Sequence, residues 1–141
     1  MPNVNIDVRK PVTLDSSVII SYLIETEINS NLAKNIWEFV VQNEIRIILP
    51  YTILIEIVSA IGRRTQNSSL AKEVENSLLN LPLIRFIELN KSRTAKVCNS
   101  ARKYGLRGMD AIIVQVSEEF KTQLITFDKE IINKLNLNYS L

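Results

Sequence analysis

Hydrophobic residues along the chain fall into short runs rich in β-branched side chains and longer stretches with helical spacing. The short runs cover residues 11–15, 45–49, 83–89 and 123–127. Each run ends at, or directly before, an aspartate, a proline or an asparagine. Short apolar runs bounded in this way are typical of strands buried in a parallel sheet. The pattern therefore predicts four such strands.

The longer stretches have apolar residues three and four positions apart, which predicts helices. These stretches are residues 16–24, 32–42, 51–64, 68–80, 91–104, 109–120 and 131–135, with Ser69 as a candidate cap for the fourth. Strands that alternate with one or two helices across short connections favour parallel pairing and right-handed crossovers. The expected fold is a three-layer α/β/α domain with a mainly parallel central sheet of four or five strands. Residues 136–141 are the candidate for a fifth, edge strand.

Length and composition indicate one soluble domain. The chain has 141 residues, of which 46% are hydrophobic and 23% charged. We expect a single domain over residues 1–141, with residues 1–10 as a loose lead-in. The apolar runs are shorter than the ~18 residues of a membrane span, and no secretory signal pattern is present. A single cysteine, Cys98, excludes an internal disulfide and fits a cytoplasmic location, and we expect it to be buried.

Charge and residue types limit the chemistry. The net charge is only +2, so any nucleic-acid affinity must come from a local patch or a bound cation. The chain has no histidine, which excludes Ser-His-Asp and Cys-His catalysis and His-ligated zinc sites. Catalysis would have to use carboxylates, hydroxyls, lysine or arginine. Hard cations with oxygen ligands are the natural cofactors for that set.

Four acidic residues are expected at one edge of the predicted sheet. Asp15 and Asp128 each end a strand, Glu56 lies one to two turns into the helix after the second strand, and Asp110 lies in the first turn of the helix that leads to the fourth. Ligands of open α/β sheets bind at this carboxyl edge. Two carboxylates ~4 Å apart repel by roughly 4 kcal/mol at an effective dielectric constant near 20. Such a cluster must take up protons or hold a cation such as Mg²⁺ or Mn²⁺.

Each acid also has a simpler interpretation. Asp15, Asp110 and Asp128 each lie where a helix begins, so a role as helix N-cap would by itself account for each of them. Glu56 has no capping role and would then be a solvated residue on an amphipathic helix. The residues one turn away from Glu56 are small, which leaves room for a ligand. Both interpretations stay open at this point.

The sequence around the four acids resembles PIN-domain nucleases. The segments are Leu14-Asp15-Ser16-Ser17-Val18-Ile19, Pro50-Tyr51-Thr52-Ile53-Leu54-Ile55-Glu56-Ile57, Met109-Asp110-Ala111-Ile112-Ile113 and Leu124-Ile125-Thr126-Phe127-Asp128. Each motif alone is weak, but all four occur in the family's order, from about Val12 to Ile131. In size and layout the chain is most similar to the VapC-type toxins of toxin–antitoxin pairs.

The resemblance implies an activity, cofactors and partners. It implies an Mg²⁺- or Mn²⁺-dependent endoribonuclease that is controlled by an antitoxin and often forms homodimers. By matching position, Asp15, Glu56, Asp110 and Asp128 would form the catalytic and metal-binding site. The hydroxyls of Ser17 and Thr126 would orient carboxylates or water.

Three arginines are the basic residues with a candidate role. Arg63, Arg64 and Arg107 are candidates to contact the RNA backbone, and a solvated helix face is the alternative for them. Tyr22 and Trp37 are expected in the core or in a groove wall; if exposed, they would mark a dimer or antitoxin surface.

A phospho-acceptor receiver domain is disfavoured, because the first strand ends in a single acid. An RNA-processing nuclease outside a toxin system, and a catalytically silent RNA- or protein-binding module, remain open.

Overall fold

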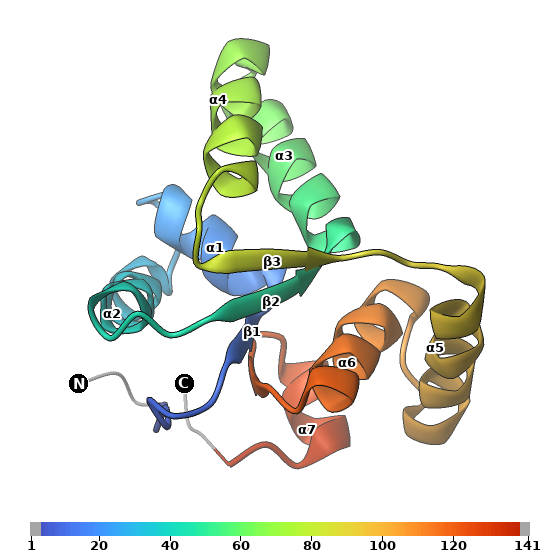
Figure 1. The fold of residues 1–141 in the computed structure, drawn as a ribbon. Helices are drawn as coiled ribbons and strands as arrows, with labels where there is room; N and C mark the ends of the chain where they lie inside the picture. The colour runs from blue at the N-terminus through green and yellow to red at the C-terminus, as the bar shows by residue number, and fades with distance from the viewer. Residues whose placement is uncertain (1–3, 139–141) are drawn as a thin grey trace.

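The protein has a four-stranded parallel sheet surrounded by helices (Figure 1). The computed structural model describes residues 4–138. Along the chain the elements are β1 (Val12–Leu14), α1 (Ser16–Leu23), α2 (Ser30–Gln42), β2 (Ile47–Pro50), α3 (Tyr51–Thr65), α4 (Ser68–Leu79), β3 (Ile84–Ile87), α5 (Lys91–Tyr104), α6 (Gly108–Phe120), β4 (Gln123–Ile125) and α7 (Lys129–Leu135). The strand order is β3-β2-β1-β4, and each neighbouring pair is parallel.

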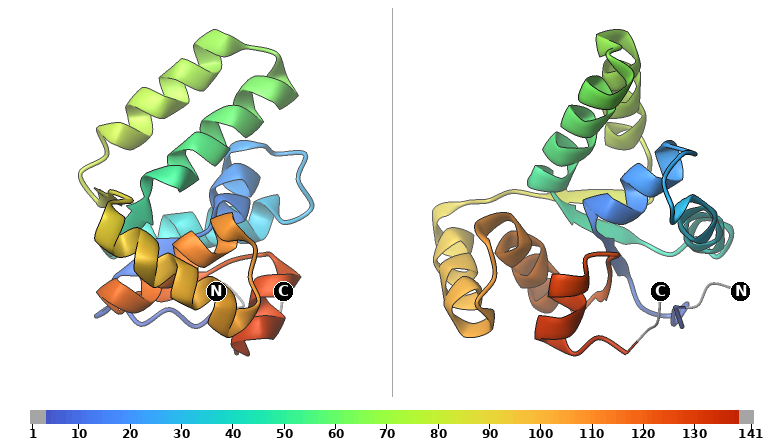
Figure 2. Two further views of the ribbon diagram at one scale, coloured as in Figure 1. Left: turned by 90° about the vertical axis from the view of Figure 1, so that its right-hand side faces the viewer. Right: turned by 180° about the vertical axis from the view of Figure 1, so that it is seen from behind.

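Helices cover both faces of the sheet, so the predicted three-layer α/β/α fold is confirmed. Helices α1 and α2 lie on one side, and α6 lies on the other with α5 packed outside it (Figures 1 and 2). Helices α3 and α4 form an antiparallel pair that projects from the sheet beyond β3 (Figure 1). Parallel strands need such crossovers, because the chain must return to the same end of the sheet.

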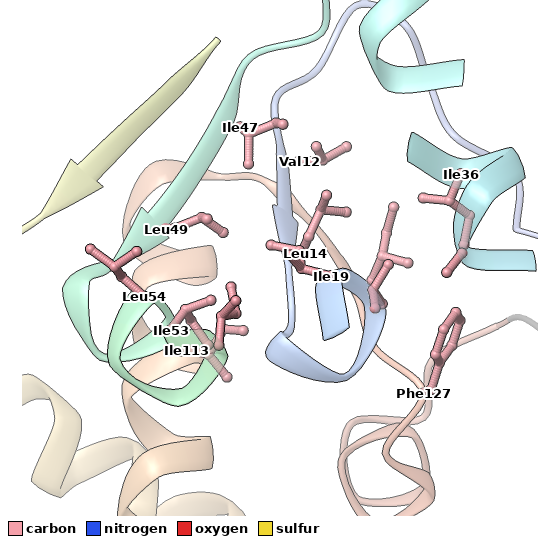
Figure 3. Close-up of a cluster of buried hydrophobic side chains, with 14 of the residues drawn as sticks. Val12, Leu14, Ile19, Ile36, Ile47, Leu49, Ile53, Leu54, Ile113 and Phe127 are labelled. Carbon is pink, nitrogen blue, oxygen red and sulfur yellow. The ribbon is translucent and has the colours of Figure 1, made fainter. Parts of the chain in front are cut away.

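The core explains why the strands read as continuous apolar runs. Strand β1 lies between β2 and β4, and its residues Val12, Thr13 and Leu14 are fully buried. A strand buried on both faces shows no polar alternation. The side chains that β1 and β2 point toward α1 and α2 form one large cluster with residues of these helices (Figure 3): Val12, Leu14, Ile47, Leu49, Ile19 and Ile36. The centre of the sheet is therefore filled mainly with apolar side chains.

Several local expectations were wrong. Residues 4–10 are not a loose lead-in, because Val4 and Ile6 are buried in the core. The Gln123 side chain also accepts a bond of 2.7 Å from the Asp7 backbone N–H and donates one of 2.9 Å to the Asp7 carbonyl. These bonds tie the N-terminal segment to β4. Helix α4 is capped by Asn67, whose side chain accepts from the backbone N–H of Leu70, and not by Ser69.

Two further expectations concern Cys98 and the C-terminal segment. Cys98 is exposed on α5, although the preceding residue, Val97, is buried. Residues 136–138 form no strand, and the remainder of the expected fifth strand lies outside the described residues. Within residues 4–138, no helix has the length and apolar character needed to cross a membrane.

Candidate active site

Asp15 is the most buried acid at the carboxyl edge of the sheet. It follows β1 directly and is only 7% exposed. Its Oδ1 accepts a bond of 2.9 Å from the Ser16 backbone N–H, so it does cap α1. Its Oδ2 accepts from the hydroxyl of Ser17 at 2.8 Å and from that of Thr126 at 2.7 Å. The capping role and a site role therefore coexist in one carboxylate.

The two hydroxyl donors join the ends of β1 and β4. Ser17 Oγ accepts a bond of 3.1 Å from the Phe127 backbone N–H, and Thr126 Oγ1 accepts one of 3.0 Å from that of Asp128. Each hydroxyl thus donates to Asp15 and accepts from the segment that leads into α7. Both hydroxyls therefore contact the Asp15 carboxylate, and their role in orienting it stays a prediction. The network fixes the position of Asp15 relative to Asp128.

Glu56 enters the site from α3. It lies one and a half turns after the start of that helix and is partly exposed. Its Oε2 accepts a bond of 2.7 Å from the hydroxyl of Ser16, the first residue of α1. Sequence reasoning missed this contact. The available signal was Ser16, the hydroxyl residue directly after Asp15, but the pattern alone could not pair it with an acid 40 positions away.

Asp110 and Asp128 reach the site from the starts of α6 and α7. Asp110 lies in the first turn of α6, but the N-cap of that helix is Arg107, so a capping role does not explain Asp110. Asp128 does cap α7, because its Oδ1 accepts a bond of 2.8 Å from the Glu130 backbone N–H. Both acids are partly exposed.

All four acids line one cleft of about 300 Å³, together with Glu27, Asn29 and Arg64. Burial raises the pKa of Asp15, the Thr126 and Ser17 hydroxyls oppose this shift, and the charge of Asp128 adds to it. The pKa of Glu56 is raised by burial and by the charges of Asp15 and Asp110. Burial and then the charges of Asp128 and Asp15 raise the pKa of Asp110. The carboxylates are therefore close enough to disfavour one another's ionisation.

The chemistry of the donor atoms in the cleft fits a hard divalent cation. All donors are carboxylate or hydroxyl oxygens, the ligands that Mg²⁺ and Mn²⁺ prefer, and a cation would relieve the repulsion among them. Among residues 4–138, no three acidic or cysteine side chains are already arranged around a single ion position. Glu56, Asp110 and Asp128 are partly exposed, whereas Asp15 is buried.

The three candidate arginines lie in different surroundings. Arg64 lines the cleft and forms an ion pair with Glu27 from the segment between α1 and α2. Arg107 lies beside Asp110 with its side chain 82% exposed, and it pairs with Glu130 at 3.1 Å. Arg63 is exposed and does not line the cleft. The structure therefore brings Arg64 and Arg107 to the acids, but not Arg63.

Fold and cleft together define an α/β protein with an acidic site at the carboxyl edge of a parallel sheet. The model of the PIN domain family matches residues 12–135, which is most of the chain. The chain belongs to the PIN domain family.

Solved structures of toxins are similar to the chain in fold. VapC20 of Mycobacterium tuberculosis, described as a toxin that cleaves the sarcin-ricin loop, matches with a TM-score of 0.74 and 13% identity over 92% of this chain and 96% of its own. A toxin–antitoxin complex from Klebsiella pneumoniae matches with a TM-score of 0.62 and 13% identity over 86% of this chain and 89% of its own. None of the curated protein sequences matches the chain significantly.

Proposed function

We propose that the protein is a metal-dependent endoribonuclease that hydrolyses RNA phosphodiester bonds. The observation that carries the proposal is the convergence of Asp15, Glu56, Asp110 and Asp128, from four separate segments, on one cleft. Membership of the PIN domain family supports it, as does the fold similarity to VapC20, a toxin described as cleaving RNA of the sarcin-ricin loop.

Each residue of the site has a proposed role. Asp15 and Asp110 would hold the main cation. Glu56 and Asp128 would bind the same cation directly or through water, or would hold a second ion. Bound Mg²⁺ or Mn²⁺ supplies positive charge against the phosphoryl oxygens and lowers the pKa of water at the site. Ser17 and Thr126 fix the orientation of Asp15, and Ser16 fixes that of Glu56. Because the chain has no histidine, the proposed reaction depends on the four carboxylates rather than on a histidine base.

We further propose that the nuclease is the toxin of a toxin–antitoxin pair, acts in the cytoplasm and forms a homodimer. The similarity to a chain from a toxin–antitoxin complex supports an antitoxin partner. Tyr22 and Trp37, which stack at 5.1 Å, are partly buried in the wall of an apolar groove of about 320 Å³, so they follow the groove-wall expectation and do not themselves mark an exposed partner surface. A gene for a small DNA-binding protein directly upstream would support the toxin role, and its absence would favour an RNA-processing nuclease.

Cleavage of a mixed RNA pool tests the nuclease proposal. We expect cleavage with Mg²⁺ or Mn²⁺, none with EDTA, and none from Asp15→Asn, whose circular-dichroism melt should remain close to that of the wild type. Glu75→Gln, which removes an acid on α4 that pairs with Lys72 outside the cleft, is the matched control and should cleave normally. Full cleavage by Asp15→Asn would refute the assignment, and metal-independent RNA binding without cleavage would indicate a silent module.

A further inference from the structure

A second groove adjoins the acidic cleft on the side of α5. Its volume is about 600 Å³, and it shares Asp110 and Asp128 with the cleft. Its other walls are mainly apolar and include Leu89 before α5 and Met109 in the first turn of α6. Leu89 and Met109 are 44% and 43% exposed, so both apolar side chains are accessible to a ligand in the groove. A ligand seated at the acids therefore has an apolar surface directly beside it.

The two directions out of the acidic site differ in charge. Toward α1 and α3 a ligand meets Glu27 and Arg64, whose opposite charges offset each other in an ion pair. Toward α5 the groove adds no acid to the two that it shares with the cleft, and it adds Arg107. A polyanion that binds at the acids is therefore repelled less on the α5 side.

Arg107 is placed to contact a phosphate at the rim of this groove. Its side chain is 82% exposed, and its ion pair with Glu130 uses one of its five N–H groups. Glu130 also pairs with Lys134 at 2.8 Å, so its charge is balanced without Arg107. The guanidinium can accordingly leave Glu130 for a phosphate without stranding an acid.

We propose that the groove binds the base of the nucleotide next to the cleaved bond, in an unpaired RNA strand. Leu89 and Met109 would contact the face of the base, and Arg107 the neighbouring phosphate. Unpaired bases are the usual targets of sequence-selective RNA recognition, because their faces and edges are accessible. This proposal rests on the proposed ribonuclease function and extends it, since the groove would determine which base the enzyme accepts.

Cys98 reports on the occupancy of the groove, because it is the only cysteine of the chain, is exposed and lines the groove. We would measure its alkylation by a maleimide in the full-length Asp15→Asn protein, with and without Mn²⁺. The probe is an unstructured RNA of about ten nucleotides, within the usual range of single-strand site sizes. At an RNA concentration of ~10 Kd, alkylation should slow by about tenfold. The same RNA with abasic nucleotides should protect Cys98 much less.

Substitutions then identify the residues that contact the base. Met109→Ala and Leu89→Ala should each weaken RNA binding by about fivefold to tenfold, because a stacked base loses its apolar contact. Leu79→Ala is the matched control, since Leu79 is 45% exposed but lies on α4, outside the groove. It should leave the RNA Kd unchanged. Circular-dichroism melts establish that all three variants are folded.

The possible results separate this proposal from the ribonuclease proposal. Metal-dependent cleavage by the wild type without protection of Cys98 overturns the groove and leaves the nuclease. Protection without any cleavage overturns the nuclease and retains a base-binding groove. Equal protection by the abasic RNA, or no RNA binding in either buffer, overturns the groove. So does a slowing of alkylation with protein concentration alone, because a second copy of the chain would then cover the groove.

Discussion

Thr126→Val tests whether a buried hydroxyl holds the Asp15 carboxylate in its charged form. Thr126 is fully buried, and its hydroxyl donates to Asp15 Oδ2 at 2.7 Å and accepts from the Asp128 backbone N–H at 3.0 Å. Valine has a similar shape but makes neither bond. We expect the metal-free variant to be less stable than the wild type, and the loss to depend on pH.

The contacts give the size of the effect. A hydrogen bond to a charged group contributes about 1.5–3 kcal/mol, and the Asp128 N–H also loses its acceptor, so we expect a total loss of ~2–3 kcal/mol where Asp15 is ionised. The Thr126 bond lowers the pKa of Asp15, so its removal raises that pKa further. Once Asp15 is protonated in both proteins, its charge no longer needs the donor. The loss should therefore shrink as the pH falls through the folded-state pKa.

Urea unfolding in EDTA at a series of pH values measures this difference. Thr13→Val is the matched control, because Thr13 is equally buried and its hydroxyl also makes two bonds, but only to neutral groups: the Ile48 carbonyl at 2.8 Å and the Thr122 hydroxyl at 2.6 Å. It should cost ~1 kcal/mol at every pH. If Thr126→Val showed the same flat dependence as Thr13→Val, the inference that the hydroxyl stabilises a charged Asp15 would be refuted.

Further predictions concern the acids and one helix cap. In EDTA, the wild type should become more stable as the pH falls from neutrality toward the ordinary glutamate pKa of 4.5, because folding raises the pKa values of Asp15, Glu56 and Asp110 and the folded state binds more protons. Asp110→Asn should flatten that rise in thermal melts, and a wild-type melting temperature that only falls over this window would contradict the expectation. Mn²⁺ at 100 times its Kd should stabilise the wild type by ~2.7 kcal/mol in urea unfolding at pH 7, and this gain should be largely absent from Asp110→Asn. Asn67→Ala should cost ~1 kcal/mol in the same assay because α4 loses its cap, whereas Ser69→Ala should change stability by less than ~0.5 kcal/mol.

The layered fold could be predicted because its signals are local. Every predicted strand is present, but β4 ends at Ile125, two residues before the predicted end. At this point the chain enters the site, where the Thr126 hydroxyl bonds to Asp15 and the Phe127 backbone N–H bonds to Ser17. The spacing of apolar residues and the turn residues locate a strand, but they do not indicate where the backbone leaves the sheet.

The convergence of the acids was predictable for the same reason. Parallel strands put their carboxyl ends at one edge, so the positions of Asp15 and Asp128 followed from strand ends alone. The bond between Ser16 and Glu56 did not, because helix spacing does not fix the direction in which α3 crosses α1. The burial of Val4 and Ile6 could not be predicted, because the segment is too short to show a periodic spacing of apolar residues. Such features depend on tertiary packing.

The bond between Thr126 and Asp15 joins positions that are 111 residues apart. During synthesis, β1 and its aspartate leave the ribosome long before β4, which must align beside β1 before the carboxylate has both hydroxyl donors. A nascent chain that lacks β4 therefore cannot complete the bonds around Asp15. Whatever chemistry the cleft performs begins only after Thr126 and Asp128 have been added to the chain.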